Sequence, residues 1–242
     1  MKFIKLNAID STNDFLRKLS QKQTLDNFTV VTANSQWKGK GQMGSKWSTE
    51  EGKNLITSIL IKDTITQIDT IFTLNITIAI AVYETLETIK IPNLAIKWPN
   101  DIMSGTKKIG GILIENSIKN DTKIDSIVGI GLNINQENFE NLPKATSLKV
   151  ITSTEFDIET ILHTLIDNIQ KNIVYINNAP NFLWEKYHNI LFKLGKPMAF
   201  ENTNNQKFMG IIQKVTQNGL LQILHEDDSI QNYGIKEITM LY

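Results

Sequence analysis

A glycine-rich basic loop at residues 36–47 holds the residue types best suited to chemistry in this sequence. Its glycines, Gly39, Gly41 and Gly44, allow positive φ and let the backbone approach a ligand closely. Lysines at positions 38, 40 and 46 add positive charge to the same stretch. Backbone N–H groups and ammonium groups together favour an anion. On its own, the loop fits either a phosphate-binding flap or a mobile surface hairpin.

The loop also has the Gly-x-Gly-x-x-Gly spacing of dinucleotide-binding sites, and Asp63 follows it by about 20 residues, as an acidic residue does there. Such a fingerprint must open a helix. Here the loop is followed by Trp47, by Gly52 and then by residues 54–61, whose composition predicts a β-strand. The order strand, glycine loop, strand is closer to a flap folded over phosphates than to a Rossmann turn.

Composition narrows the class of protein. The 242 residues suffice for one large domain and a small one. Lysine plus arginine and aspartate plus glutamate number 25 each, so no net field favours nucleic acid, and the basic loop acts locally. Arg17 is the only arginine in the chain. Lysine can therefore stand where arginine is expected.

No feature of the sequence indicates export, a membrane span or a metal cluster. The absence of cysteine excludes disulfides, thiolate metal sites and a cysteine nucleophile, and it agrees with a cytoplasmic location. The histidines at 163, 188 and 225 are too far apart for a His-x-x-x-His motif. The first residues lead into a strand without a signal peptide. The longest apolar run, residues 78–83, is shorter than the roughly 18 residues of a membrane span.

The first half of the chain alternates between strands and helices. Residues 3–6 alternate as an edge strand does, and Asp10-Ser11-Thr12-Asn13 precedes a short helix. The hydroxyl and amide groups of this tetrapeptide either cap that helix or point into a pocket. Strands are predicted at 28–32 and 54–61, on either side of the glycine loop. Apolar residues at steps of three and four predict a long buried helix at 68–90.

Glycines also fall inside two predicted strands. A short strand at 94–98 ends at Pro99. Next, the strand at 109–115 contains Gly110-Gly111, and the segment 125–135 contains Gly129-x-Gly131. Glycine lowers the stability of a strand interior and often marks the close approach of a ligand or another backbone. These glycines predict one shared floor beneath a ligand.

The last part of the chain changes from helices to short strands. An amphipathic helix is predicted at 158–176, and a further helix begins at Pro180. From residue 196 onward, short strands are expected at 197–200, 208–215 and 220–224, with an Asn218-Gly219 hairpin turn and a last strand around 235–241. Strands of this length predict a small barrel.

The ordered motifs resemble those of biotin protein ligases. Two of them follow the glycine loop: Lys97-Trp98-Pro99-Asn100-Asp101 and Lys108-Ile109-Gly110-Gly111-Ile112-Leu113-Ile114-Glu115. The early Asp10-Ser11-Thr12-Asn13, the pattern of Gly39 to Trp47, the segment from Gly129 to Asn135 and the terminal barrel fall in the same order and spacing as in that family. The resemblance covers essentially the whole chain.

The resemblance implies a fold and a domain organisation. The fold class is α+β: a mixed β-sheet catalytic domain of the class II aminoacyl-tRNA synthetase and biotin ligase type, with helices packed on one side. This domain is expected at residues 1–190, followed by a small SH3-like β-barrel at 191–242. Since the chain begins at the first strand of the catalytic domain, we expect a ligase without the helix-turn-helix domain that binds DNA in bifunctional members.

The resemblance further implies a two-step reaction. Biotin and ATP would give biotinyl-5′-adenylate and pyrophosphate, and the biotinyl group would then pass to one lysine of a biotin carboxyl carrier protein, a subunit of acetyl-CoA carboxylase or a related enzyme. Mg²⁺ would be carried by ATP, with Asn133 as the nearest candidate group and no certain protein ligand. The expected partners are the carrier protein, biotin and ATP, without DNA or membrane; a homodimer is left open.

Residue roles carry over by position. Lys108, Asp101 and Lys40 are the expected catalytic residues: Lys108 would hold the biotin carboxylate and the α-phosphate, and Asp101 would receive a proton from the acceptor lysine. Without the motif, Lys108 would be a solvated lysine and Asp101 a turn residue. The residues expected to bind biotin are Ser11, Thr12, Asn13, Gln36, Gly39, Lys40, Lys108, Gly111, Gly129 and Gly131. Those expected to bind ATP are Lys40, Gly41, Gln42, Trp47, Asn100, Lys108 and Asn133.

One departure from the family and two alternatives remain. Many members carry arginines throughout the glycine loop, whereas this chain has Lys40, Gln42, Met43 and Ser45 there. The neutral residues predict weaker retention of the adenylate.

The alternative enzyme is a lipoate or octanoate ligase of related fold. The alternative without catalysis is a biotin or nucleotide-binding protein, or a binding module centred on the barrel.

Overall fold

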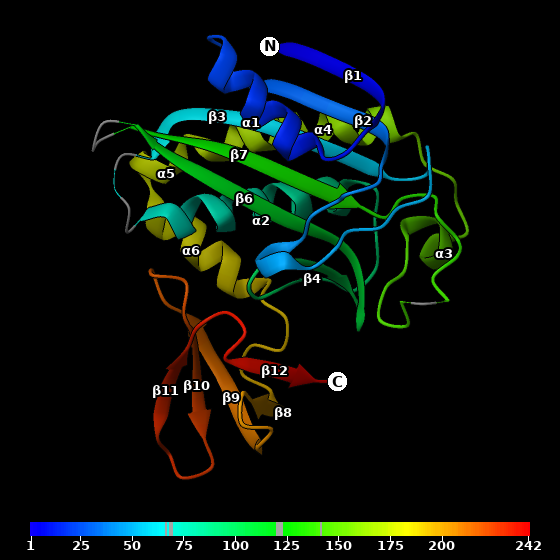
Figure 1. The fold of residues 1–242 in the computed structure, drawn as a ribbon. Coiled ribbons are helices and arrows are strands. Elements are labelled where there is room, and N and C mark those ends of the chain that lie inside the picture. Colours follow the sequence, from blue (N-terminus) through cyan, green and yellow to red (C-terminus); the bar gives the residue numbers. More distant parts are fainter. Residues whose placement is uncertain (66, 68–69, 120–122, 141) are drawn as a thin grey trace.

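The computed structural model describes residues 1–65, 67, 70–119, 123–140 and 142–242 and contains two β-sheets (Figure 1). The first is a seven-stranded mixed sheet in the order β1-β2-β3-β7-β6-β5-β4, and the second is a five-stranded sheet in the order β11-β10-β9-β8-β12. The strands of the first sheet are β1 (Lys2–Ile9), β2 (Thr29–Gln36), β3 (Leu55–Ile65), β4 (Leu94–Lys97), β5 (Asp101–Ser104), β6 (Lys107–Lys119) and β7 (Lys123–Leu132). Those of the second, the C-terminal sheet, are β8 (Pro197–Asn202), β9 (Lys207–Val215), β10 (Leu221–His225), β11 (Ile230–Tyr233) and β12 (Ile238–Leu241).

The predicted mixed sheet and small terminal barrel are confirmed as these two sheets. In the first, β1 pairs with β2 in parallel at one edge, and the other neighbours are antiparallel. All pairs in the C-terminal sheet are antiparallel. The sequence did not predict β5 or β11. Each has four residues with at most two apolar ones in a row, whereas the equally short β4 begins with the apolar run Leu-Ala-Ile.

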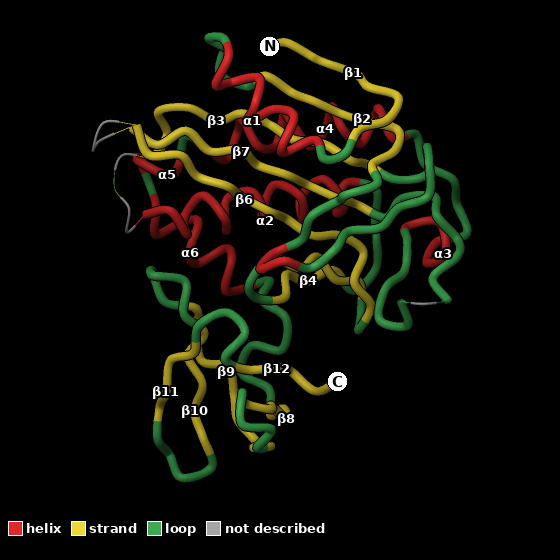
Figure 2. Tube along the Cα trace, in the orientation of Figure 1, coloured by secondary structure: helices red, strands yellow, loops and turns green. Residues whose placement is uncertain are grey.

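Helices cover both faces of the first sheet, so the prediction of helices on one side is wrong. Helix α1 (Thr12–Lys22) lies on one face, where Leu16 packs with Leu60 and Ile127 in a small apolar cluster. The main core lies on the other face. Figure 2 shows the remaining long helices on that side of the sheet. The strand residues explain the difference: Ile59 points into the main core and the next residue, Leu60, into the α1 cluster. A continuous apolar run of this kind is typical of a strand buried on both faces.

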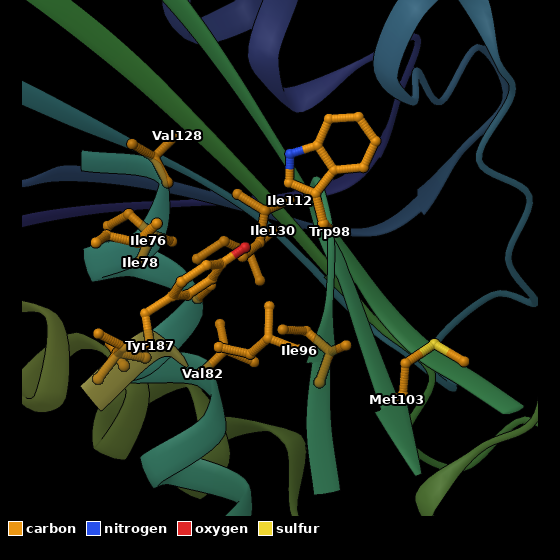
Figure 3. Packing of buried hydrophobic residues seen from close by; sticks show 14 of the residues in the cluster. Ile76, Ile78, Val82, Ile96, Trp98, Met103, Ile112, Val128, Ile130 and Tyr187 are labelled. Carbon is orange, nitrogen blue, oxygen red and sulfur yellow. The ribbon is translucent and has the colours of Figure 1, made fainter. Parts of the chain in front are cut away.

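The helices of the main core are α2 (Ile71–Thr88), α4 (Ile158–Ile173), α5 (Tyr175–Asn178) and α6 (Pro180–Asn189), and a short helix, α3 (Leu148–Thr152), follows the first sheet. By length and composition alone α2 could cross a membrane, but 61% of it is buried inside the protein. Figure 3 shows Ile76, Ile78 and Val82 of α2 packed with Tyr187 of α6 against the sheet. Helix α2 is therefore the central helix of the main core.

The same core continues into the C-terminal sheet. Phe200 and Ile223 of that sheet belong to one cluster with the residues of α2 and the first sheet. The Trp98 indole N–H donates a hydrogen bond of 2.9 Å to the Gly219 carbonyl in the turn before β10. Because no break in packing separates the sheets, the division into domains of 1–190 and 191–242 stays a prediction.

Candidate functional site

A cavity of about 470 Å³ lies on the α1 face of the first sheet, between the glycine loop and the C-terminal sheet. All the predicted site residues except Gly39 and Asn133 line it: Ser11, Thr12, Asn13, Gln36, Lys40, Gly41, Gln42, Trp47, Asn100, Asp101, Lys108, Gly111, Gly129 and Gly131. These residues come from the start of α1, the end of β2, the loop after it, the turn before β5, and strands β5, β6 and β7. The fold thus joins motifs that are far apart in sequence.

Glycines of β6 and β7 form the floor of the cavity. Gly111 lies directly opposite Gly131 in the β6–β7 ladder, and Gly129 lies two residues along on the same face. A Cβ atom on Gly131 would be 2.5 Å from the Trp47 ring, and one on Gly129 would be 2.4 Å from Oδ1 of Asn13. The groups that approach these glycines closely are therefore two side chains of the protein itself, those of Trp47 and Asn13.

Gly110 does not belong to this floor, which corrects the prediction that both glycines of the pair do. A Cβ atom on Gly110 would point away from the cavity, 2.4 Å from the Leu132 side chain and 3.5 Å from that of Ile102. Successive residues of a strand face opposite sides. Gly110 instead permits close packing with the two neighbouring strands.

A β-bulge turns Lys108 toward the cavity. Strict alternation from Gly111 would point residue 108 to the opposite face. The β5–β6 register shifts between Ile102 and Met103, which pair with Gly110 and Lys108 respectively, so β6 carries one extra residue. Bulges of this kind re-aim side chains. The Lys108 ammonium consequently reaches the cavity wall, although sequence periodicity alone would not place it there.

Asp101 lies between two lysines at this wall. Its Oδ1 forms a salt bridge with the Lys108 ammonium, and its Oδ2 lies 3.7 Å from Lys97 Nζ. Lys97 is opposite Asp101 in the β4–β5 ladder, so both side chains emerge on the same face. The ion pairs place one carboxylate and two ammonium groups where an anionic ligand can compete for the lysines.

The glycine loop folds back on itself as a short hairpin, hereafter the glycine hairpin. The Gly41 N–H donates to the Ser45 carbonyl at 2.7 Å, and the Trp47 N–H donates to the Gly39 carbonyl at 2.9 Å. Met43 at its tip has a φ of 52°, and Gly44 a φ of 82°. The predicted order strand, loop, strand is confirmed, and the loop opens no helix of Rossmann type.

The tip of the glycine hairpin touches the turn before β12, next to the C-terminal sheet. The Lys236 ammonium donates a hydrogen bond of 2.6 Å to the Met43 carbonyl. At the hairpin's root, Lys38 donates to Asp10 at 3.1 Å, and this hydrogen bond, with a second from the Trp37 indole, lowers the pKa of the Asp10 carboxyl. The hairpin is therefore held at both ends and forms a roof over the cavity.

Trp47 brings an unused donor to the cavity. Its ring lies over Gly131, and the Lys108 ammonium is 5.6 Å from the ring centroid. The indole Nε1 is buried and has no hydrogen-bond partner among the residues that the structure describes. A buried donor without a partner is unfavourable and commonly marks a place where a ligand or water binds.

The tetrapeptide before α1 serves both purposes left open by the sequence. Ser11 caps the helix, because its Oγ accepts the Asp14 N–H at 3.4 Å. Thr12 and Asn13 are buried, and both contact the Ser58 hydroxyl, at 2.8 and 2.6 Å respectively. The N-terminal end of α1 therefore supplies a polar wall above the glycine floor.

Gly39 and Asn133 lie outside the cavity lining. Gly39 lets the two sides of the glycine hairpin approach, since a Cβ atom there would be 2.2 Å from the Trp47 carbonyl. The Asn133 amide donates to the Thr146 carbonyl at 3.0 Å. Within the described residues, no group of three His, Cys, Asp or Glu side chains could hold a metal ion.

Sequence reasoning missed one wall of the cavity. Residues of the C-terminal sheet and the turn before β12 line it, namely Ile235, Lys236, Ile238, Thr239 and Met240, and so does Lys97 of β4. Lys97 lies in a motif that the sequence singled out, so its neighbour Asp101 could have indicated it. The other five carry no signal, because their position depends on how the second sheet packs on the first.

Comparisons with known proteins agree with one another. The model of the biotin/lipoate A/B protein ligase family matches residues 6–133. The bifunctional ligase/repressor BirA of Bacillus spizizenii is 28% identical over 241 residues, which cover 96% of this chain and 70% of the relative. The biotin acetyl-CoA-carboxylase ligase of Mycobacterium tuberculosis is 26% identical over 215 residues, 87% of this chain and 79% of the relative. The structure of a biotin protein ligase from Aquifex aeolicus in complex with biotin and ATP superposes with a TM-score of 0.81 and 27% identity, covering 99% of this chain and 98% of the other.

Proposed function

Because the chain belongs to the biotin/lipoate A/B protein ligase family, we propose that it is an ATP-dependent biotin protein ligase. In the first step an oxygen of the biotin carboxylate attacks the α-phosphorus of ATP, the bond to the β-phosphate breaks, and pyrophosphate leaves. In the second step the amine of an acceptor lysine attacks the acyl carbon of biotinyl-5′-adenylate. An amide forms, AMP leaves, and the amine gives up a proton.

The observation that carries the proposal is the Lys108 ammonium, paired with Asp101 beside a glycine floor inside a roofed cavity. Two anions, a carboxylate and a phosphate, repel each other as they react. A fixed positive charge between them stabilises the transition state more than the separate substrates. On binding, the two anions compete with Asp101 for Lys108, while Lys97 remains near Asp101.

Asp101 then serves the second step. An amine with an ordinary lysine pKa of ~10.4 is mostly protonated at neutral pH and is a poor nucleophile. A carboxylate at the cavity wall can receive its proton. Lys40 of the glycine hairpin and Gln42 beside it line the roof of the cavity, where they would face the phosphates.

Mg²⁺ enters with ATP in this proposal and neutralises part of the phosphate charge. The acceptor is a lysine of a biotin carboxyl carrier protein. Since the reaction consumes ATP, we place the enzyme in the cytoplasm.

Transfer to an acceptor tests the proposal. Purified protein is incubated with biotin, ATP, Mg²⁺ and an isolated biotin carboxyl carrier domain, and the domain is analysed by intact mass spectrometry. Addition of one biotinyl group, abolished when the acceptor lysine is replaced by arginine, is the expected result. Modification of a lipoyl carrier domain by lipoate or octanoate, with no biotinylation, would overturn it.

A further inference from the structure

We propose that Arg17, the only arginine in the chain, is a positioning residue that holds Lys40 and Asn13 in place at the wall of the cavity. This inference rests on the proposed function, because Lys40 and Asn13 are residues through which the biotin substrate would be held. Arg17 itself does not line the cavity. It acts through two carboxylates, Asp14 and Glu115.

The guanidinium of Arg17 joins these carboxylates. Its Nη1 donates to Glu115 Oε1 at 2.7 Å, and its Nη2 forms a salt bridge with Asp14 Oδ1. Each carboxylate turns its second oxygen toward a cavity residue. Lys40 Nζ lies 2.6 Å from Asp14 Oδ2 and also donates to Oδ1 at 2.8 Å, and Glu115 Oε2 accepts the Asn13 amide at 2.9 Å. One arginine therefore connects the roof of the cavity to its polar wall.

The Asn13 end of this series of ion pairs and hydrogen bonds has little freedom to move. The Asn13 side chain is buried, with its Nδ2 also 3.4 Å from the Leu113 carbonyl and its Oδ1 accepting from the Ser58 hydroxyl. Gly129 lies against it so closely that a Cβ atom there would overlap Asn13 Oδ1. The Asn13 side chain is therefore oriented by Glu115, the Leu113 carbonyl and the Ser58 hydroxyl, and a shift of Glu115 would remove one of these contacts.

The charges of the four ionised residues in this connection also balance. Arg17 and Lys40 are positive, and Asp14 and Glu115 are negative. Without the arginine, a net negative charge would stand beside a cavity that must admit a carboxylate. Lysine cannot replace arginine here, because a single ammonium does not offer the planar fork of donors that reaches two carboxylates at once.

Asn13 is expected to contact biotin and not ATP, whereas Lys40 is expected to contact both, so loss of the connection should act more on biotin than on ATP. For Arg17→Met and Arg17→Lys, we expect the KM for biotin to rise about tenfold, the factor of one lost interaction of moderate strength. The KM for ATP should rise by a smaller factor, because only the Lys40 end of the connection is expected to contact ATP. Lys18→Met is the matched control, since it removes a neighbouring, exposed positive charge from the same helix.

Adenylation is followed as pyrophosphate release with biotin or ATP varied in turn, and the thermal midpoint of each variant is measured alongside. If wild type releases no pyrophosphate with biotin, the proposed function fails. If wild type is active and Arg17→Lys keeps its KM for biotin, a single charge suffices and the positioning role is overturned. Equal increases in both KM values, or the same change in Lys18→Met, would also overturn it. Should Arg17→Met fail to fold, Arg17→Lys decides the matter.

Discussion

Replacing Lys108 by glutamine tests the proposed charge at the reacting atoms. The substitution removes one positive charge at the cavity wall and leaves a side chain of similar length that can still donate hydrogen bonds. Asp101 loses one ion pair but keeps Lys97, whose Nζ lies 3.7 Å away. The fold should therefore survive, while the two anions lose the cation that holds them together.

The size of the effect follows from simple electrostatics. Two unit charges 4 Å apart attract by about 4 kcal/mol at an effective dielectric constant of 20, which corresponds to a factor of roughly 10³ in rate as an upper bound. The Lys108 side chain is 33% exposed, so water screens part of this attraction. We expect kcat for adenylate formation to fall by about 10² or more, the usual range for one lost transition-state donor.

The stability should change much less. A partly exposed ion pair contributes about 0.2–1 kcal/mol, which moves the thermal midpoint of a chain of this size by no more than roughly 4 °C. The matched control is Lys107→Gln, because Lys107 is exposed and its ammonium bonds to the Pro143 carbonyl outside the cavity. Single-turnover adenylation at saturating biotin and ATP measures the step. A rate within a few-fold of wild type, or an equal loss in Lys107→Gln, would refute the role of Lys108.

Three further predictions concern the floor, the roof and the pH dependence of stability. Gly129→Ala should lower biotin-dependent activity and destabilise the protein by about 1–3 kcal/mol, because the added Cβ displaces buried Asn13; unchanged biotin affinity measured by calorimetry would contradict this. Gln42→Arg and Ser45→Arg should each slow the dissociation of labelled biotinyl-adenylate, since arginine offers a fork of donors to phosphate, and faster release from both would show that these positions do not face it. Burial lowers the pKa of His188, so the folded protein binds a proton less readily there than the unfolded chain does. This contribution to stability should be complete above a pH of about 6.5 and decline as the pH falls below it; thermal midpoints of wild type and His188→Gln with identical pH dependence between 8 and 5 would argue against it.

The sequence predicted which residues form the site better than it predicted the directions in which their side chains point. The glycines at 111, 129 and 131 predict a floor because glycine lowers the stability of a strand interior unless a ligand or another backbone approaches closely. The β6–β7 ladder places these three glycines together. Gly110 was assigned to the same floor wrongly, since a two-residue repeat puts it on the other face. Lys108 reaches the cavity only because β6 contains a β-bulge, and no periodicity in the sequence predicts that bulge.

The parts that could not be predicted depend on contacts between distant elements. Lys236 and Met240 line the cavity because the C-terminal sheet packs against the first, and this packing involves the Trp98 to Gly219 hydrogen bond across 121 positions of sequence. Similarly, α1 covers a second face of the sheet through Leu16. Local propensity identifies such a helix but says nothing of the face on which it lies.

The most direct test of the account is pyrophosphate release by the purified protein with ATP and Mg²⁺, compared with biotin, lipoate and octanoate as the acid. The account predicts release that depends on biotin, exceeds that with either of the other acids and is lost in Lys108→Gln but not in Lys107→Gln. Equal or greater release with lipoate or octanoate, or none with biotin, would contradict it.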